Sequence, residues 1–165
     1  MPEHRAHAIL VPLFNTEQSL LERMATFTRV IAAFLSASGA VAINLGGAHA
    51  THEATFFVDI ASIEEPLPAM LMIWNGISVA KDGDRVSLLS LGMAQLDLPD
   101  LLLTAPATAV NGALECMFDL LAYIASRAAP LPEGDTIGVR ADDRHTVRYE
   151  PSPLADGTDV WCVDL

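Results

Sequence analysis

Two histidines and a glutamate lie close together in the stretch "GGAHATHEATFFVDIA", and these residue types can bind a metal ion. His49 and His52 are three residues apart, and Glu53 follows directly. Imidazole nitrogens and carboxylate oxygens are ligands of catalytic zinc, and a bound metal ion activates water for hydrolysis. One hypothesis is therefore a metal-dependent hydrolase, in which Asp59 or His145 supplies a further ligand.

The spacing of this cluster also has a simpler interpretation. The order His-x-x-His-Glu matches neither the zinc-protease helix, with its two histidines four residues apart, nor its inverted form. Thr51 is a good N-cap, so the pattern predicts a short helix from His52 to about Ala61. Glu53 would then sit favourably at the positive end of the helix dipole. We favour this interpretation over the metal site, and we expect no bound metal or other cofactor.

A second polar group recurs at four-residue spacing: Asn111, Glu115 and Asp119. These residues fall within a helix predicted from about Thr108 to Ala129. The inner face of that helix is the apolar set Val110, Leu114, Met117, Leu121 and Ile124. The outward polar face could bind a basic ligand or a cation, although a solvated face opposite an apolar stripe is the more common arrangement.

Trp74 and Asn75 form a third candidate, a binding site for a small ligand or a partner. They lie in the apolar run "AMLMIWNGISVA", which with "RVSLLSLGMA" flanks "KDGD" and predicts a β-hairpin. Asn75-Gly76 inside a strand indicates a bulge, where a tryptophan can line a groove. Core packing is the alternative role for Trp74.

The sequence contains no arrangement typical of nucleophilic or nucleotide-dependent catalysis: no nucleophile elbow, no Walker loop and no dinucleotide fingerprint. Cys116 and Cys162 are far apart and lack metal-type spacing, so we expect reduced thiols in a cytoplasmic protein. An enzyme is therefore the less favoured class.

The composition restricts the possible partners. Hydrophobic residues make up 52% of the chain and charged residues only 18%, which predicts a second buried surface for self-association or a partner. The net charge of −12 disfavours nucleic acid and anionic membranes. The most apolar stretch, Val30 to Leu45, is shorter than the roughly 20 residues of a membrane span, and the N-terminus does not resemble a signal peptide.

The elements that would position these residues form an α+β domain. The apolar pattern predicts a strand over His7–Phe14, a long helix capped by Asn15 and ending near Gly39, and a buried strand "AVAINL". The segment "LDLPDLLLTAPAT" reads as a loop or a crossing segment, because two prolines punctuate it. "TIGVR", "HTVRYE" and "DVWCVD" read as short strands. We therefore expect a single domain over residues 1–165, with a mostly antiparallel sheet on which two long helices and one short helix pack.

Two further stretches resemble a known family. "LSLGMAQLDLPDL" (Leu89–Leu101) and "DLLAYIASRAAPLPEGDTIG" (Asp119–Gly138) are similar to segments of the bacterial family called domain of unknown function 4261, and the resemblance extends over roughly residues 8–164. It implies no enzyme activity, cofactor or catalytic residue. The residues of its motifs are mostly turn and packing types: Gly92, Leu98, Pro99, Asp100, Tyr123, Gly134, Asp135 and Gly138.

These observations favour a non-enzymatic cytoplasmic protein-binding domain, with an immunity-like or adaptor role. The expected partner is another protein or a further copy of the chain in a homo-oligomer, and neither nucleic acid nor membrane. The alternative is the metal-dependent hydrolase built on His49, His52 and Glu53.

Overall fold

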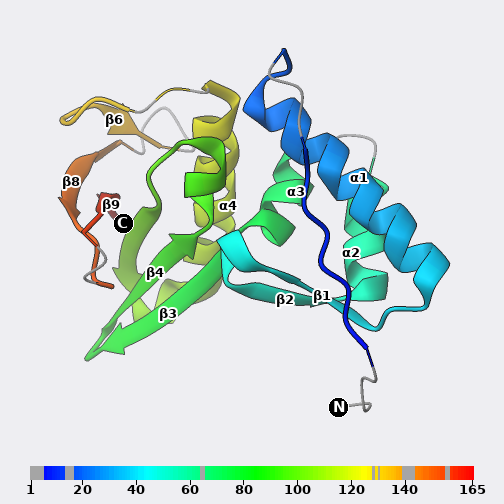
Figure 1. Ribbon diagram of the computed structural model, residues 1–165. Coiled ribbons are helices and arrows are strands. Elements are labelled where there is room, and N and C mark those ends of the chain that lie inside the picture. Colours follow the sequence, from blue (N-terminus) through cyan, green and yellow to red (C-terminus); the bar gives the residue numbers. More distant parts are fainter. Residues whose placement is uncertain are drawn as a thin grey trace.

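A computed structural model of the chain describes residues 6–13, 17–63, 66–127, 129, 131–138, 144–154 and 157–165. Figure 1 shows two lobes side by side. One lobe holds three helices and a two-stranded ribbon, and the other holds a five-stranded sheet with a long helix behind it. A single large cluster of buried apolar side chains includes residues from both lobes.

The first long helix, α1 (Leu20–Ser38), forms on the predicted apolar stripe and ends at Gly39, as expected. Ser19 is its N-cap: the Ser19 hydroxyl accepts a hydrogen bond from the Glu22 amide, and the Glu22 carboxylate accepts one from the Ser19 amide. Hydrogen bonds from the hydroxyl and the amide of Ser19 lower the pKa of Glu22. Asn15, the predicted cap, lies outside the described residues.

The prediction of a strand over His7–Phe14 is wrong for residues 7–13, the part that the structure describes. Residues 6–13 are extended, but they belong to no strand, and within the described chain no strand pairs with them. Exposed and half-buried side chains alternate along residues 9–13, as they do in a strand. A strand also needs a second strand to pair with, and a local sequence pattern cannot reveal that partner.

A small β-ribbon follows α1. The predicted strand is β1 (Ala42–Leu45), and a 3₁₀ turn, η1 (Gly46–Ala48), leads into β2 (Ala50–Glu53), which pairs with β1 antiparallel. The Asn44 side-chain amide fastens the ribbon by donating hydrogen bonds to the Ala50 carbonyl and the Thr51 hydroxyl.

The helix predicted to start at His52 with Thr51 as its cap begins later. Both residues lie in β2, and α2 (Ala54–Ala61) follows with Glu53 at the N-cap position and no side-chain cap. In the ribbon His52 lies opposite Ile43 and Thr51 lies opposite Asn44, so both residues hold the extended geometry of a strand.

The prediction of a strand is wrong for the first half of "AMLMIWNGISVA". Residues Pro66–Trp74 form a helix, α3, which packs against α2, and only Gly76–Asp82 form the strand β3. Asn75 is therefore a helix-to-strand junction and not a bulge. The predicted hairpin is confirmed: β3 pairs antiparallel with β4 (Arg85–Leu91).

The segment "LDLPDLLLTAPAT", predicted as a loop or a crossing segment, contains a central strand, β5 (Leu101–Pro106). Its prolines lie before the strand and at its last position, where a missing N–H donor is tolerated. β5 pairs antiparallel with β4 and parallel with β9 (Asp159–Asp164), and β8 (Arg148–Pro151) completes the sheet order β3-β4-β5-β9-β8. A separate pair joins β6 (Thr136–Ile137) to β7 (His145–Thr146).

The second long helix, α4 (Val110–Arg127), is confirmed, and a 3₁₀ turn, η3 (Ala107–Ala109), precedes it. It packs on α3 and on β5. Met117, Leu121 and Ile124 are buried as predicted, but Leu114 is 38% exposed and Ala113 takes the inner position.

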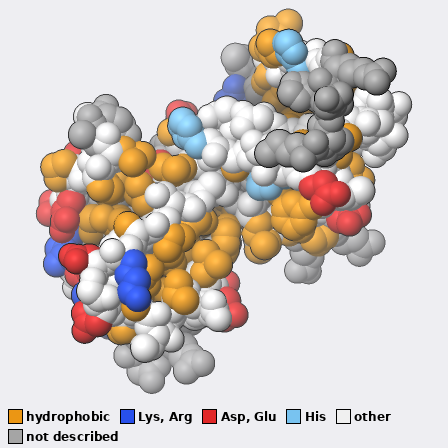
Figure 2. Space-filling view, turned by 90° about the horizontal axis from the view of Figure 1, so that it is seen from below, with side chains coloured by type: hydrophobic (Ala, Val, Ile, Leu, Met, Phe, Trp, Pro, Cys, Tyr) orange, Lys and Arg blue, Asp and Glu red, His pale blue; other side chains and the backbone are white. Residues whose placement is uncertain are grey.

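The fold is α+β with a mostly antiparallel sheet, as predicted, but it has two short helices instead of one. On the face shown in Figure 2, hydrophobic side chains gather over the lobe that holds the sheet, and most of the charged side chains lie around them.

Candidate functional site

Trp74 belongs to the core and does not line a groove. Its side chain is 2% exposed, and its indole nitrogen donates a 2.8 Å hydrogen bond to the Thr28 hydroxyl. The Thr28 hydroxyl in turn donates to the Met24 carbonyl one turn earlier in α1. Trp74 thus ties α3 to α1, which is the packing role considered as the alternative.

Asn75 occupies the buried junction between α3 and β3. It is 3% exposed, and its side-chain amide donates to the Leu71 carbonyl at 3.0 Å. In the described chain nothing donates to its oxygen, Oδ1. A Cβ atom added to Gly92 would lie 3.0 Å from that oxygen and 2.3 Å from the Trp74 carbonyl oxygen. The close approach of the Gly92 backbone leaves no open groove at this place.

The two histidines and Glu53 do not converge. His49 adopts a left-handed conformation (φ 50°) in the turn between the strands and is exposed. His52 is half-buried in β2, with its Nε2 atom 3.0 Å from the Ile73 carbonyl oxygen. Glu53 is the next residue along, and successive strand side chains point to opposite faces. In the described residues no group of three histidines, cysteines or acids could hold a metal ion.

The outward face of α4 does gather the predicted polar residues. Asn111, Glu115 and Asp119 are all exposed on successive turns of this helix. The same four-residue series continues through Tyr123, which is 47% exposed, and Arg127. We call these five residues the α4 stripe. The sequence predicted its first three members, and extending the same spacing would have found the other two.

The tyrosine of the α4 stripe is held by its neighbour. The Arg127 guanidinium donates a 2.9 Å hydrogen bond to the Tyr123 hydroxyl and lies 5.6 Å from the centre of its ring. This contact restricts the rotation of an exposed aromatic side chain. A fixed aromatic side chain beside two carboxylates is suited to binding a partner, because ordering it costs little conformational entropy.

Asp100 organises the turn between β4 and β5. Its Oδ1 atom accepts hydrogen bonds from the Ser90 hydroxyl and from the backbone amides of Gly92 and Met93, at 2.9 to 3.0 Å. Its backbone carbonyl accepts a bond from the Trp161 amide of β9. These bonds fix the 3₁₀ turn η2 (Met93–Leu96) against three strands.

Both the Asp100 turn and the α4 stripe lie in one part of the chain. Residues 89–164 match the family model described as domain of unknown function (DUF4261). The resemblance is confirmed for this C-terminal part. The DUF4261 match runs from the end of β4 to the end of β9 and contains Gly92, Pro99 and Asp100 of the motif. No curated protein and no solved structure matches the chain.

The DUF4261 region also contains both cysteines, and neither forms a disulfide. Burial raises the pKa of the Cys162 thiol to about 11, and the charge of the nearby Glu150 adds to this effect. The thiolate is the reactive form of cysteine, so Cys162 is chemically inert at neutral pH. Cys116 is half-buried on α4.

The apolar character of α4 has a structural explanation. By length and composition alone, residues Ala107–Arg127 could cross a membrane. In the fold, one side of this helix packs on the sheet and on α3, and the opposite side carries Glu115 and Asp119. The apolar residues are those expected of a helix that covers a core.

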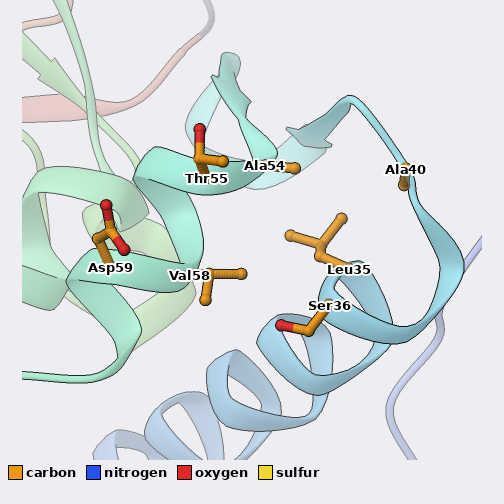
Figure 3. A pocket seen from close by; sticks show the side chains of 7 residues that line it. All are labelled: Leu35, Ser36, Ala40, Ala54, Thr55, Val58 and Asp59. Carbon is orange, nitrogen blue, oxygen red and sulfur yellow. The ribbon is translucent and has the colours of Figure 1, made fainter.

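A shallow hollow lies outside the DUF4261 region, between the end of α1 and α2 (Figure 3). Its volume is about 220 Å³, smaller than the roughly 300 Å³ at which ligand pockets begin. Leu35, Ala54 and Val58 point into it, whereas the Asp59 carboxylate lies at its margin. The Ser36 hydroxyl is used by its own helix, donating to the Ala32 carbonyl. The hollow therefore offers few polar groups to orient a ligand.

Proposed function

We propose that this protein is a non-enzymatic, cytoplasmic protein-binding domain and that the α4 stripe is its contact surface. The observation that carries the proposal is the held aromatic ring of Tyr123 among exposed polar residues on successive turns of one helix. Aromatic side chains dominate the energy of protein contacts when they insert into a partner's pocket.

The charge of the surface indicates the chemistry of the partner. Glu115 and Asp119 lie one turn apart on the stripe, and the whole chain carries a net charge of −12. Like charges at this spacing slightly destabilise a helix, and a basic partner would relieve that repulsion. Such a field also speeds association with a positively charged surface. We therefore propose a basic protein as the partner, which suits an adaptor or immunity-like role.

The experiment is a pull-down from the cells that make the protein, with the captured proteins quantified by mass spectrometry. Tagged wild type is compared with a Glu115→Lys/Asp119→Lys variant and with Tyr123→Ala. Glu133→Lys is the matched control, because Glu133 is an exposed acid in a turn away from α4. Circular dichroism verifies that each variant is folded.

We expect one basic protein to be captured in stoichiometric amount by wild type and by Glu133→Lys. The double charge reversal should lower its recovery at least about tenfold, which corresponds to about 1.4 kcal/mol of binding free energy, and Tyr123→Ala should lower it similarly. Equal recovery by all variants would contradict the assignment of the surface. Absence of any stoichiometric partner would contradict the proposed function.

A further inference from the structure

We propose that two copies of this chain associate through residues 9–13, which pair antiparallel with Val11 at the two-fold axis. This self-association goes beyond the proposed function and uses a surface separate from the α4 stripe. The strip is defined by the side chains of Ile9, Val11 and Leu13.

The strip is the most exposed apolar surface of the described chain. The exposed fractions of Ile9, Val11 and Leu13 are 80%, 72% and 98%, whereas no other large hydrophobic side chain in the described residues exceeds 59%. Leu10 and Pro12, between them, are half-buried, and Leu10 packs against the main core cluster. One side of the segment is thus seated on its own lobe, and the other side is bare.

The backbone of this segment is free to form a strand. Residues 6–13 are extended, and within the described chain their backbone groups form no hydrogen bonds. Figure 1 shows the segment, in dark blue, running along the outside of the helical lobe. An extended apolar segment with unused N–H and C=O groups is a template for pairing with another strand.

The charge of the chain indicates that the strip binds a second copy of the chain and not a basic protein. Residues 6–13 contain no Asp, Glu, Lys or Arg, although the chain has 21 acidic residues and a net charge of −12. Two such acidic molecules repel one another, so a contact between them is most favourable where neither presents a charge. A basic protein would find no carboxylate in this strip, so the basic partner proposed for α4 does not suit it.

The pattern of the strip is also complementary to itself. Three apolar residues at i, i+2 and i+4 allow a two-fold axis through the middle residue, with Ile9 of one copy opposite Leu13 of the other. If Val11 faces Val11 as a hydrogen-bonded pair, residues 9, 11 and 13 use their backbone groups. Pro12 then falls where no N–H donor is needed, so its ring does not interrupt the pairing.

The size of the strip sets the strength of the association. A stable interface buries about 800 Å² on each partner, which is more than a five-residue strand can provide alone. We therefore expect a weak dimer that forms as the protein concentration rises.

Sedimentation equilibrium across a wide concentration range tests this inference. Wild type should rise from the monomer mass of 17.6 kDa toward twice that value. Val11→Asp should stay monomeric, because two carboxylates would meet at the axis. Val79→Asp is the matched control: Val79 is 59% exposed on β3, and this variant should dimerise like wild type. Circular dichroism verifies that both variants fold.

Disulfide trapping supplies a second readout. Val11→Cys should form a covalent dimer under mild oxidation, because paired strands bring the two Cα atoms to about 5.5 Å. Wild type, with Cys116 and Cys162 only, should not. A wild type that stays monomeric at every concentration, or a dimer that Val11→Asp does not weaken, overturns the inference. Either result leaves the α4 proposal standing, since Tyr123→Ala should not alter the mass.

Discussion

The indole nitrogen of Trp74 donates a hydrogen bond to the hydroxyl of Thr28, 46 residues earlier, and both side chains are buried. Replacing Thr28 with valine keeps the shape but removes the acceptor, so the buried indole N–H would lose its partner. We expect the free energy of unfolding to fall by about 1 to 3 kcal/mol, measured by urea denaturation. Thr28→Ser keeps the hydroxyl and should lose less. A smaller loss for Thr28→Val than for Thr28→Ser would argue that packing matters more than the hydrogen bond here.

Asp100 should be more important for stability than its partly exposed position suggests. Asp100→Ala leaves the Ser90 hydroxyl and two backbone amides without their acceptor. Hydrogen bonds to a charged group contribute roughly 1.5 to 3 kcal/mol each, so we expect a loss of at least about 3 kcal/mol in chemical unfolding. Asp100→Asn keeps an acceptor oxygen and should lose less. Asp97→Asn, at an exposed aspartate of the same turn, is the control and should change little.

Two glycines should respond to alanine in opposite ways. Gly92 has φ 147°, and an added Cβ atom would lie 2.3 Å from the Trp74 carbonyl oxygen, so Gly92→Ala should strongly destabilise the fold. Gly112 lies within α4, where an added Cβ atom meets nothing within 4 Å. Gly112→Ala should raise the free energy of unfolding by about 0.5 to 1 kcal/mol. A thermal melt in which Gly92→Ala is as stable as Gly112→Ala, or more stable, would contradict this geometry.

The two thiols should differ in reactivity. With the pKa of Cys162 at about 11, only about one molecule in a thousand carries its thiolate at pH 8. A thiol reagent should therefore label at most one cysteine in the native protein and two after denaturation. Rapid labelling of both cysteines in the folded state would show that β9 opens or that the thiol is not buried.

The N-cap of α1 makes the free energy of unfolding depend on pH. The pKa of Glu22 is lowered in the folded protein by the hydrogen bonds from Ser19, so the unfolded chain binds its proton more tightly. The contribution of this contact is present above the ordinary pKa of 4.5 and disappears as the pH falls through the lowered value. We expect Glu22→Gln to be less stable than wild type at pH 7 and to approach it in acid, in melts at several pH values. If the difference in stability between Glu22→Gln and wild type does not narrow in acid, the loss of stability has another cause.

The sequence pattern predicted the two long helices and, with a shifted start, the short helix α2, but it could not predict α3. α1 and α4 extend over several turns, so their apolar stripes are distinct. Residues 66–74 are apolar on all sides, and such a run suits a buried strand equally well. Their contacts with α2 and α4 favour the helix, and the contacts with α4 join segments far apart in the sequence.

The candidate surface was predictable for the same reason as α4 itself. Asn111, Glu115 and Asp119 share a face because helix geometry places residues four apart on successive turns. The role of Asp100 could not be seen in this way, because its partners come from residues seven to ten positions earlier, across a turn whose shape Asp100 itself determines. The prediction that a helix starts at His52 is wrong, because the pairing of β2 with β1 overrode the capping preference of Thr51.

The parallel pairing of β5 with β9 determines when the sheet can be completed during synthesis. β9 consists of residues 159–164 and lies between β5 and β8, and the amide of Leu165 bonds to the Thr104 carbonyl. While residues 159–164 are still inside the ribosome, β5 has a bare edge and β8 lacks its neighbour in the sheet. We therefore expect the sheet to close only once β9 has been synthesised and has emerged from the ribosome, and until then to depend on chaperones that shield its apolar edge.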